Sequence, residues 1–173
     1  MVKILSWNIA GIRPSLKRGE LDFLQNNEYD IICFQETKAD ENQVILTNDI
    51  PEIFPYRYWE SNKGITQKKG FSGTCIWSKQ EALKLPSPDF DLEGRITCIE
   101  YSTFILVNVY TPNSQSPDSE RFIFRSKSWD NNFRKYINEL NSKKNTIICG
   151  DFNVAHKDID VYDSHKKKKE QDF

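Results

Sequence analysis

Polar side chains that could act on a phosphate ester follow four strand-like runs of this sequence. They are Asn8, Glu36, Tyr110, Asn113, Asp151 and Asn153. In α/β proteins the side chains at the carboxyl ends of strands converge on one cleft, so these groups are expected to meet. Clustered carboxylate and amide oxygens suit a hard cation, Mg²⁺ or Mn²⁺, and they lack the soft ligands that zinc prefers.

Phosphodiester cleavage needs a positive centre that neutralises the developing charge and a base that activates water. Glu36 is the candidate metal ligand, and Asp151 is the candidate for orienting or deprotonating the water. The amide and phenol groups that could bind phosphate oxygens or the water are Asn8, Asn113, Asn153 and Tyr110. Taken singly, each position is more often a cap, a turn residue or a surface charge. Together they indicate a site without identifying its substrate.

Six runs rich in Ile, Val, Phe, Tyr and Trp predict the strands that must position these groups. They cover residues 2–7, 30–35, 73–78, 95–101, 103–111 and 145–149. Most are apolar on both faces, which indicates strands covered on both sides. Ser102 alone separates the fourth run from the fifth, which predicts an antiparallel hairpin. Apolar spacing predicts helices over residues 15–26 and 119–140, the second capped by Ser119, and the order of elements predicts a mixed α/β sandwich.

The composition is that of one soluble globular domain. The chain has 173 residues, of which 38% are hydrophobic, and its 24 basic residues nearly balance 25 acidic ones. The resulting net charge of -1 neither indicates nor excludes a nucleic-acid partner, because an overall sum hides local basic patches. The four cysteines lie in apolar runs without a Cys-x-x-Cys pair, so we expect reduced thiols packed as small hydrophobes.

The ends and loops of the chain carry little chemistry. The first predicted strand begins within two residues of Met1, and no apolar run approaches the ~18 residues of a membrane span, so we expect an intracellular protein without membrane contact. The loop of residues 61–70 is polar. Residues 163–173 form a lysine-rich segment that we expect to be a flexible, solvated tail, with a nucleic-acid contact as the less favoured alternative.

Six blocks of the sequence resemble the exonuclease III and apurinic/apyrimidinic endonuclease family, which is part of the endonuclease/exonuclease/phosphatase superfamily. The blocks cover residues 6–13, 30–38, 70–74, 93–95, 107–114 and 149–160. The most specific are Gln-Glu-Thr-Lys at 35–38, Tyr-x-Pro-Asn at 110–113 and Gly-Asp-Phe-Asn-Val-Ala-His at 150–156. These blocks separate the sequence from superfamily relatives that act on inositol phosphates, sphingomyelin or poly(A).

The resemblance implies a deoxyribonuclease I-like fold, a mixed-sheet four-layer α/β sandwich. It also implies a monomer that uses Mg²⁺ or Mn²⁺ to hydrolyse the phosphodiester 5′ to an abasic site in double-stranded DNA. A 3′-to-5′ exonuclease activity is a further expectation.

Carried over position by position, the resemblance makes Glu36 the principal metal ligand, with Asn8 beside it. Tyr110 would contact the scissile phosphate. Asp151 would be the catalytic acid/base, and Asn153 would help to hold phosphate and nucleophile. The remaining substrate-binding residues would be Asn113 near the lesion, Arg95, and the DNA-facing Lys38, Phe71, Arg13, Arg121 and Arg125.

The sequence also departs from the family pattern. Ala10 stands where the family often has Asp or Asn, and Glu170 and Asp172 replace an Asn and a Gly expected near DNA phosphate. His156 is better explained as part of a structural turn than as the catalytic histidine. The family pattern continues past Phe173 with a Trp-Arg-x-Asp-Tyr strand and a Ser-Asp-His block, which supplies that histidine.

We therefore expect residues 1–173 to form a single domain that lacks the C-terminal third of the family fold. Such a fragment or truncated product should expose apolar sheet faces and unpaired strand edges, and should show little or no turnover. Two other functions remain open. One is a phosphodiesterase or phosphatase acting on a substrate other than DNA. The other is a non-catalytic remnant that binds DNA or a protein.

Overall fold

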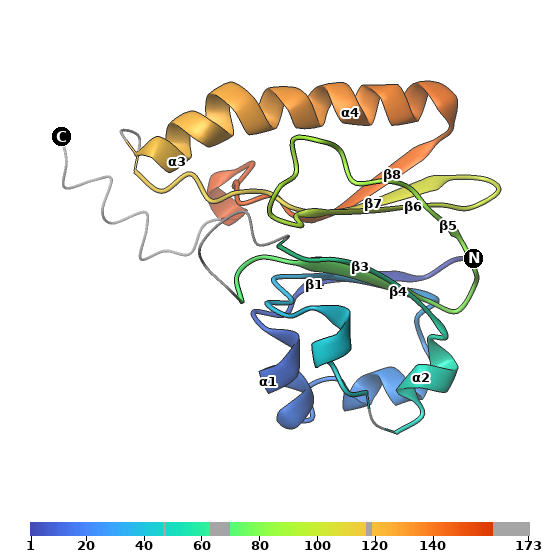
Figure 1. The fold of residues 1–173 in the computed structure, drawn as a ribbon. Helices are drawn as coiled ribbons and strands as arrows, with labels where there is room; N and C mark the ends of the chain where they lie inside the picture. Colours follow the sequence, from blue (N-terminus) through green and yellow to red (C-terminus); the bar gives the residue numbers. More distant parts are fainter. Residues whose placement is uncertain (47, 63–69, 117–118, 161–173) are drawn as a thin grey trace.

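Two four-stranded β-sheets lie face to face at the centre of the molecule (Figure 1). The computed structural model describes residues 1–46, 48–62, 70–116 and 119–160. The first sheet has the order β1 (Ile4–Asn8), β2 (Ile31–Gln35), β4 (Thr74–Ser78) and β3 (Tyr56–Glu60). The second has the order β5 (Leu83–Lys84), β6 (Ile96–Glu100), β7 (Ile105–Tyr110) and β8 (Thr146–Asp151).

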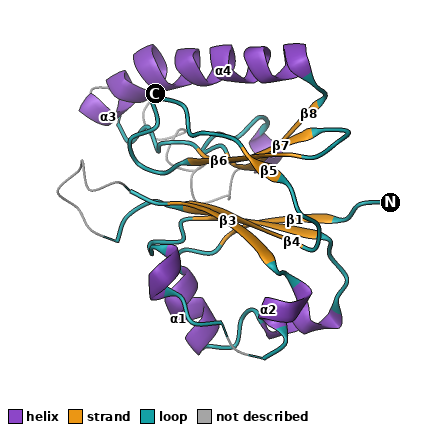
Figure 2. Ribbon diagram, turned by 45° about the vertical axis from the view of Figure 1, so that its right-hand side comes forward, coloured by secondary structure: helices purple, strands orange, loops and turns teal. Residues whose placement is uncertain are grey.

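Helices form the two outer layers, one on each sheet (Figure 2). The layer on the first sheet contains α1 (Ile12–Lys17), 3₁₀ turns at Asp22–Asn26 and Glu41–Gln43, and α2 (Ile50–Ile53). The layer on the second is one long helix made of α3 (Glu120–Ile123), a π-helical segment (Phe124–Trp129) and α4 (Asp130–Lys143). A further 3₁₀ turn is Asp158–Asp160. The predicted mixed-sheet, four-layer α/β sandwich is thus confirmed.

Neighbouring residues of each central strand pack into different layers, which explains why the strands are apolar on both faces. In β2, Ile31 and Cys33 face the space between the sheets, where they meet Ile76, Ile99 and Leu106. The alternate side chains of the same strand join the cluster beneath the first sheet, and β6 and β7 pack in the same way against α4. The strand ends are therefore anchored from both sides.

The helix predicted over residues 15–26 is divided in two. Gly19 has a φ of 72°, and its N–H donates to the carbonyl of Leu16 at 3.0 Å, which ends α1. The chain then turns and continues as the 3₁₀ segment Asp22–Asn26. Because glycine adopts the left-handed conformation without a steric penalty, this residue is a natural stop signal for the helix.

The second predicted helix and the hairpin are confirmed. The Ser119 hydroxyl accepts a hydrogen bond from the N–H of Phe122 at 3.1 Å, as an N-cap does. Strands β6 and β7 pair in antiparallel register. Strands β3 and β5 were not predicted, because β3 mixes charged residues with its aromatics and β5 has only two residues.

Within the described residues, β1 pairs only with β2, and β8 pairs only with β7. Side chains on these edges are partly exposed, among them Ile147 at 42%. The cysteines at 33, 75 and 98 are buried, and Cys149 is partly exposed. Most of the polar loop and the whole lysine-rich tail, with Glu170 and Asp172, lie outside the described residues. In the part of the chain that the structure describes, no helix is long and apolar enough to cross a bilayer.

Candidate active site

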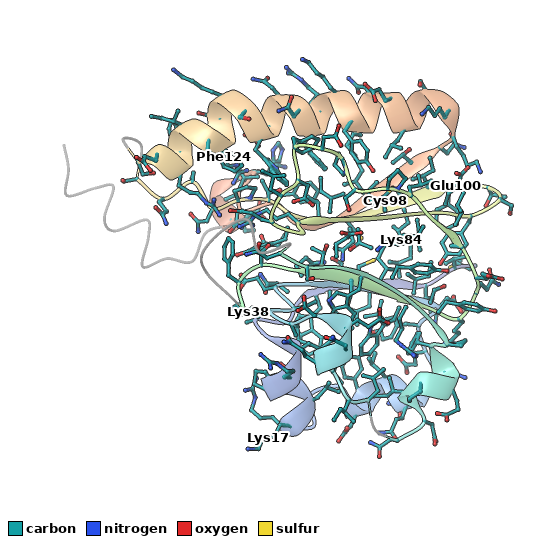
Figure 3. The ribbon with its side chains drawn as sticks, in the orientation of Figure 1. Lys17, Lys38, Lys84, Cys98, Glu100 and Phe124 are labelled. Carbon is teal, nitrogen blue, oxygen red and sulfur yellow. The ribbon has the colours of Figure 1, made fainter. Side chains whose placement is uncertain are left out.

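The carboxyl ends of four strands meet at one end of the sandwich. β1 runs parallel to β2, with Asn8 opposite Gln35, and β7 runs parallel to β8, with Tyr110 opposite Asp151. Each pair therefore ends at a common edge, and Glu36 follows directly after β2. Lys38, close to this edge, and Phe124 of the helical layer lie toward the same end of the molecule, away from Glu100 (Figure 3).

A single side-chain amide joins the two sheets at this edge. The Asn8 Nδ2 group donates to Glu36 Oε1 at 3.0 Å and to Asp151 Oδ2 at 2.8 Å. The Asn8 Oδ1 atom accepts the N–H of Ala10 at 3.1 Å, which fixes the orientation of the amide. Two carboxylates from different sheets are thus held within one hydrogen bond of the same nitrogen atom.

Glu36 is held in its ionised form. Its Oε2 atom lies 2.8 Å from Lys38 Nζ, and its side chain is 20% exposed. Burial raises the pKa of Glu36, but hydrogen bonds from Lys38, Asn8 and Tyr110 outweigh that effect, so the pKa lies below its ordinary value. Such a carboxylate is negatively charged at neutral pH, as a metal ligand must be.

Tyr110 is held as a protonated phenol. Burial and, secondarily, its hydrogen bond with Glu36 raise the pKa of Tyr110 to about 12. The guanidinium carbon of Arg95 lies 4.6 Å from the centre of the Tyr110 ring, within the range of a cation–π contact. At neutral pH this phenol can donate a hydrogen bond toward an anionic group in the site.

Asp151 is tied to the loop that follows it. Its Oδ1 atom accepts the N–H of Asn153 at 2.9 Å, and its main-chain carbonyl accepts the N–H of Thr111 at 2.9 Å. The Asn153 Nδ2 group donates to the carbonyl of Thr111 at 2.7 Å. Gly150 is required here, because a Cβ at this residue would lie 1.9 Å from the carbonyl oxygen of Val109. The ends of β7 and β8 are therefore interlocked.

Several site loops depend on residues in the left-handed region of backbone space. Ala10, Glu36, Lys38 and Asn153 have φ values of 50°, 54°, 52° and 48°. Residues other than Gly, Asn and Asp adopt this region at a cost of about 1–2 kcal/mol. The conformation turns the chain sharply at each strand end and so directs the polar side chains toward one another.

Arg95 is not on the surface. It is 1% exposed, its Nε atom lies 2.5 Å from Glu93 Oε2, and its NH1 group donates to the carbonyl of Tyr110 at 3.0 Å. The expectation that Arg95 binds substrate therefore needs correction. The side chain lies beneath Tyr110 and supports it.

The remaining predicted substrate-binding residues have different surroundings. Arg13 and Asn113 are exposed, and the Asn113 Oδ1 atom accepts the N–H of Gln115 at 2.8 Å. The guanidinium of Arg121 lies 5.8 Å from the Phe71 ring and pairs with Glu93. Arg13, Asn113, Phe71 and Arg121 lie in loops or helices at the surface and keep part of their area accessible.

Arg125 differs from that group. Its side chain is only 11% exposed, and its guanidinium donates to the carbonyls of Pro112, Phe152 and Asn153. It was predicted to face DNA, but its hydrogen-bonding groups are turned toward the loops that follow β7 and β8.

Two buried polar groups beside the site were not predicted. Gln35 donates from Nε2 to Asn108 Oδ1 at 2.7 Å, and Asn108 Nδ2 donates to the carbonyls of Phe34 and Cys75 at 2.8 and 3.0 Å. Both side chains are essentially inaccessible, at 1% and 0%. The one sequence signal for this buried pair was Asn108, an amide residue in the middle of the apolar run of β7.

Asp91 is a second unpredicted support. Its carboxylate accepts main-chain N–H groups of Arg95, at 2.8 Å, of Ile96, at 2.8 Å, and of Glu93, at 3.3 Å. Burial raises the pKa of Asp91, and these hydrogen bonds lower it in part. The loop that leads into β6 is organised around this residue.

The donor set fits a hard divalent cation. Mg²⁺ needs one or two carboxylates, keeps several waters and prefers oxygen ligands. Glu36 and Asp151 provide two carboxylates, and the Asn8 amide between them donates a hydrogen bond to each. Among the described residues, no group of three or more His, Cys, Asp or Glu side chains could hold a metal ion. Two carboxylates, with waters completing the shell, suit Mg²⁺ or Mn²⁺.

The fold is a two-sheet α/β sandwich with acidic, amide and phenol groups at its strand ends. In addition, residues 5–171 match the model of the Endonuclease/Exonuclease/phosphatase family. The chain belongs to this family, which is generally dependent on divalent metal ions. The resemblance inferred from the motifs is confirmed.

Comparison with known relatives indicates which members of this family the chain resembles. The chain is 39% identical over 165 residues to an exodeoxyribonuclease of Bacillus subtilis, covering 92% of this chain and 62% of the relative. It is 34% identical over 176 residues to a DNA-(apurinic or apyrimidinic site) endonuclease of Dictyostelium discoideum, covering 99% and 47%. The structure of an AP endonuclease from Archaeoglobus fulgidus superimposes with a TM-score of 0.79 at 27% identity, covering 97% and 63%. The chain thus spans about half to five-eighths of the length of these relatives.

Proposed function

We propose that this chain carries the metal-binding and acid/base part of a DNA repair nuclease, which hydrolyses the phosphodiester 5′ to an abasic site in double-stranded DNA. The observation that carries the proposal is the Asn8 amide, bonded at once to Glu36 and Asp151. It gathers two carboxylates from separate sheets, as a hydrated cation and a general base require. The names of the relatives support DNA as the substrate.

Each residue has a defined part in the proposed reaction. Glu36 would be the principal ligand of Mg²⁺ or Mn²⁺, with Asn8 beside it, and the bound ion would supply positive charge to the phosphate. Asp151, held by Asn8 and Asn153, orients the attacking water and accepts its proton. Tyr110, whose phenolic hydrogen is bonded to Glu36 in this structure, turns that hydrogen to a phosphate oxygen, since a pKa of about 12 keeps the group protonated.

The surrounding residues are assigned to the DNA. Asn113 and Asn153 lie on the loops that follow β7 and β8, where a phosphate at the strand ends would be within reach. Exposed or partly exposed cationic groups near this edge, Arg13, Lys38 and Arg121, are proposed to contact the phosphate backbone. Phe71 offers an aromatic face beside them.

A gel assay with an end-labelled duplex that contains one abasic-site analogue tests the proposal. The 173-residue chain should incise the labelled strand 5′ to the lesion in Mg²⁺ with little turnover, as the sequence predicts, and an excess of chelator should abolish that incision. An undamaged duplex and a phosphoinositide serve as matched alternative substrates. Turnover of the lipid headgroup would replace the proposal with a phosphatase. Binding of the abasic duplex without incision would assign the chain a non-catalytic role.

A further inference from the structure

Arg125 lies in the π-helical segment between α3 and α4, on the side of the helical layer that faces the site loops. Its NH1 group donates to the carbonyls of Pro112 and Asn153, both at 2.9 Å, and its NH2 group donates to the carbonyl of Phe152 at 2.8 Å. Its Nε atom lies 3.4 Å from Asp130 Oδ1. One guanidinium thus binds three main-chain acceptors.

These acceptors belong to two different loops of the site. Pro112 precedes Asn113 in the loop after β7, while Phe152 and Asn153 follow Asp151 in the loop after β8. The two loops are the chain segments that set where the amide and acid groups stand relative to each other. Arg125 therefore links the two loops through its hydrogen bonds.

The chemistry of the side chain makes this bridge specific. A guanidinium is planar and presents five N–H groups in a fixed arrangement, whereas a lysine ammonium offers a single point. The three hydrogen bonds use both hydrogens of NH1 and one of NH2, and Nε faces Asp130. One N–H remains, too little for the paired hydrogen bonds by which arginine grips a phosphate.

We propose that Arg125 is a positioning residue that fixes the loop of Asn113 against the loop of Asp151 and Asn153, rather than a contact to DNA. The inference rests on the proposed function of this site. Removal of the guanidinium should loosen the two loops together and misplace the water-activating carboxylate, while the affinity for DNA stays nearly constant. Misplacement of a catalytic group by about 1 Å is enough to slow a reaction about a hundredfold.

The test compares Arg125→Lys and Arg125→Met with Arg134→Lys in the 173-residue chain. Arg134 is an exposed arginine of α4 whose side chain contacts only Asn131 among the hydrogen bonds described, so it controls for loss of a helix-surface arginine. Amide hydrogen exchange is followed at Thr111, whose N–H donates to the carbonyl of Asp151 across the two loops, and at Asn153, whose N–H donates to the Asp151 carboxylate within the second loop. Steady-state incision of abasic duplex is measured at several salt concentrations.

Both Arg125 variants should exchange about tenfold or more faster at Thr111 and Asn153, with no change at Val107 in the core of β7. Their kcat should fall about 10- to 100-fold, while KM and its dependence on salt match the wild type. Arg134→Lys should match the wild type in every measurement.

Unchanged exchange at the two loop amides would overturn the proposal. So would an increase in KM with a salt dependence shallower by about one charge and an unchanged kcat, since that is the signature of a lost phosphate contact. If the wild-type chain incises no DNA at all, the proposed function fails for this chain, and the exchange measurements alone decide the role of Arg125.

Discussion

The buried amide pair between the sheets gives the most quantitative prediction. Asn108 of β7 accepts from Gln35 and donates to the carbonyls of Phe34 and Cys75, so it spans from one sheet to two strands of the other. The change to test is Asn108→Ala. It removes all three hydrogen bonds at a residue with 0% exposure, where water cannot replace them.

The expected loss of stability depends on which polar groups lose a hydrogen-bond partner in Asn108→Ala. Gln35 keeps the Ser6 hydroxyl and the carbonyl of Cys33 as acceptors, both at 3.1 Å, so its two amide hydrogens remain bonded. The carbonyls of Phe34 and Cys75 each lose one donor. A buried polar group left without its partner costs about 1–3 kcal/mol, and carbonyl oxygens with a second partner lie at the low end. With the small cavity added, Asn108→Ala should destabilise the fold by about 2–4 kcal/mol.

Urea unfolding followed by tryptophan fluorescence measures this loss. For an m-value of about 2 kcal/mol per molar, the midpoint should fall by about 1–2 M. Asn138→Ala is the matched control, because Asn138 is an exposed asparagine of α4 and its loss should change stability by no more than about 0.5 kcal/mol. A double-mutant cycle with Gln35→Ala should give a coupling of about 1 kcal/mol or more.

Two results would refute this reasoning. One is an Asn108→Ala protein whose midpoint equals that of the Asn138→Ala control. The other is a cycle in which the effects at Gln35 and Asn108 simply add, because independent side chains do not act as a bridge between sheets.

The other predictions concern the site itself. Glu36→Ala and Asp151→Ala should each slow Mg²⁺-dependent incision about a hundredfold or more, and unchanged rates would exclude the assigned role. Lys38→Met should raise the pKa of Glu36 in a carboxyl-carbon NMR titration, because Lys38 is the largest of the contacts that lower it. A carboxylate whose pKa is lowered in the folded state contributes stability above its unfolded pKa, and that contribution is lost as the pH falls. The Lys38→Met variant should therefore lose stability at neutral pH and differ little from wild type in acid. An unshifted Glu36 titration would contradict the contact with Lys38. Glu93→Gln should destabilise the chain by about 3 kcal/mol in urea unfolding, because it removes the negative charge that faces the buried Arg95, and a loss below about 1 kcal/mol would contradict that pairing.

The convergence of the acidic and amide groups could be predicted from the sequence because it follows from strand direction. Parallel strands end at the same edge, so Asn8 and Glu36, and Tyr110 and Asp151, were bound to be neighbours once each pair of runs was recognised. The mixed α/β sandwich could be predicted for a similar reason, since strands apolar on both faces must be covered on both sides, whereas its four layers were implied by the family resemblance.

The supporting residues could not be predicted, because their roles depend on the direction of a side chain after packing. Arg95 and Arg125 are indistinguishable from surface arginines by residue type, yet one lies under Tyr110 and the other on the carbonyls of two loops. Strand β3 was missed because an edge strand with charged residues lacks the continuous apolar pattern. The break in the first helix had a signal, Gly19, but an isolated glycine within an apolar pattern is often tolerated.

The left-handed backbone at the strand ends also limits how this site can vary. At Ala10, Glu36 and Lys38 the side chain that is present conflicts with its own backbone conformation. β-Branched residues would be excluded at these positions whatever their polarity. If a library randomised at position 10 is selected only for folding, glycine and asparagine should be enriched. At position 36 only Glu→Asp could reduce the backbone strain and keep a carboxylate, and the shorter aspartate side chain would then have to reach the same partners. Tolerance to mutation in these loops is therefore set by backbone geometry as much as by chemistry.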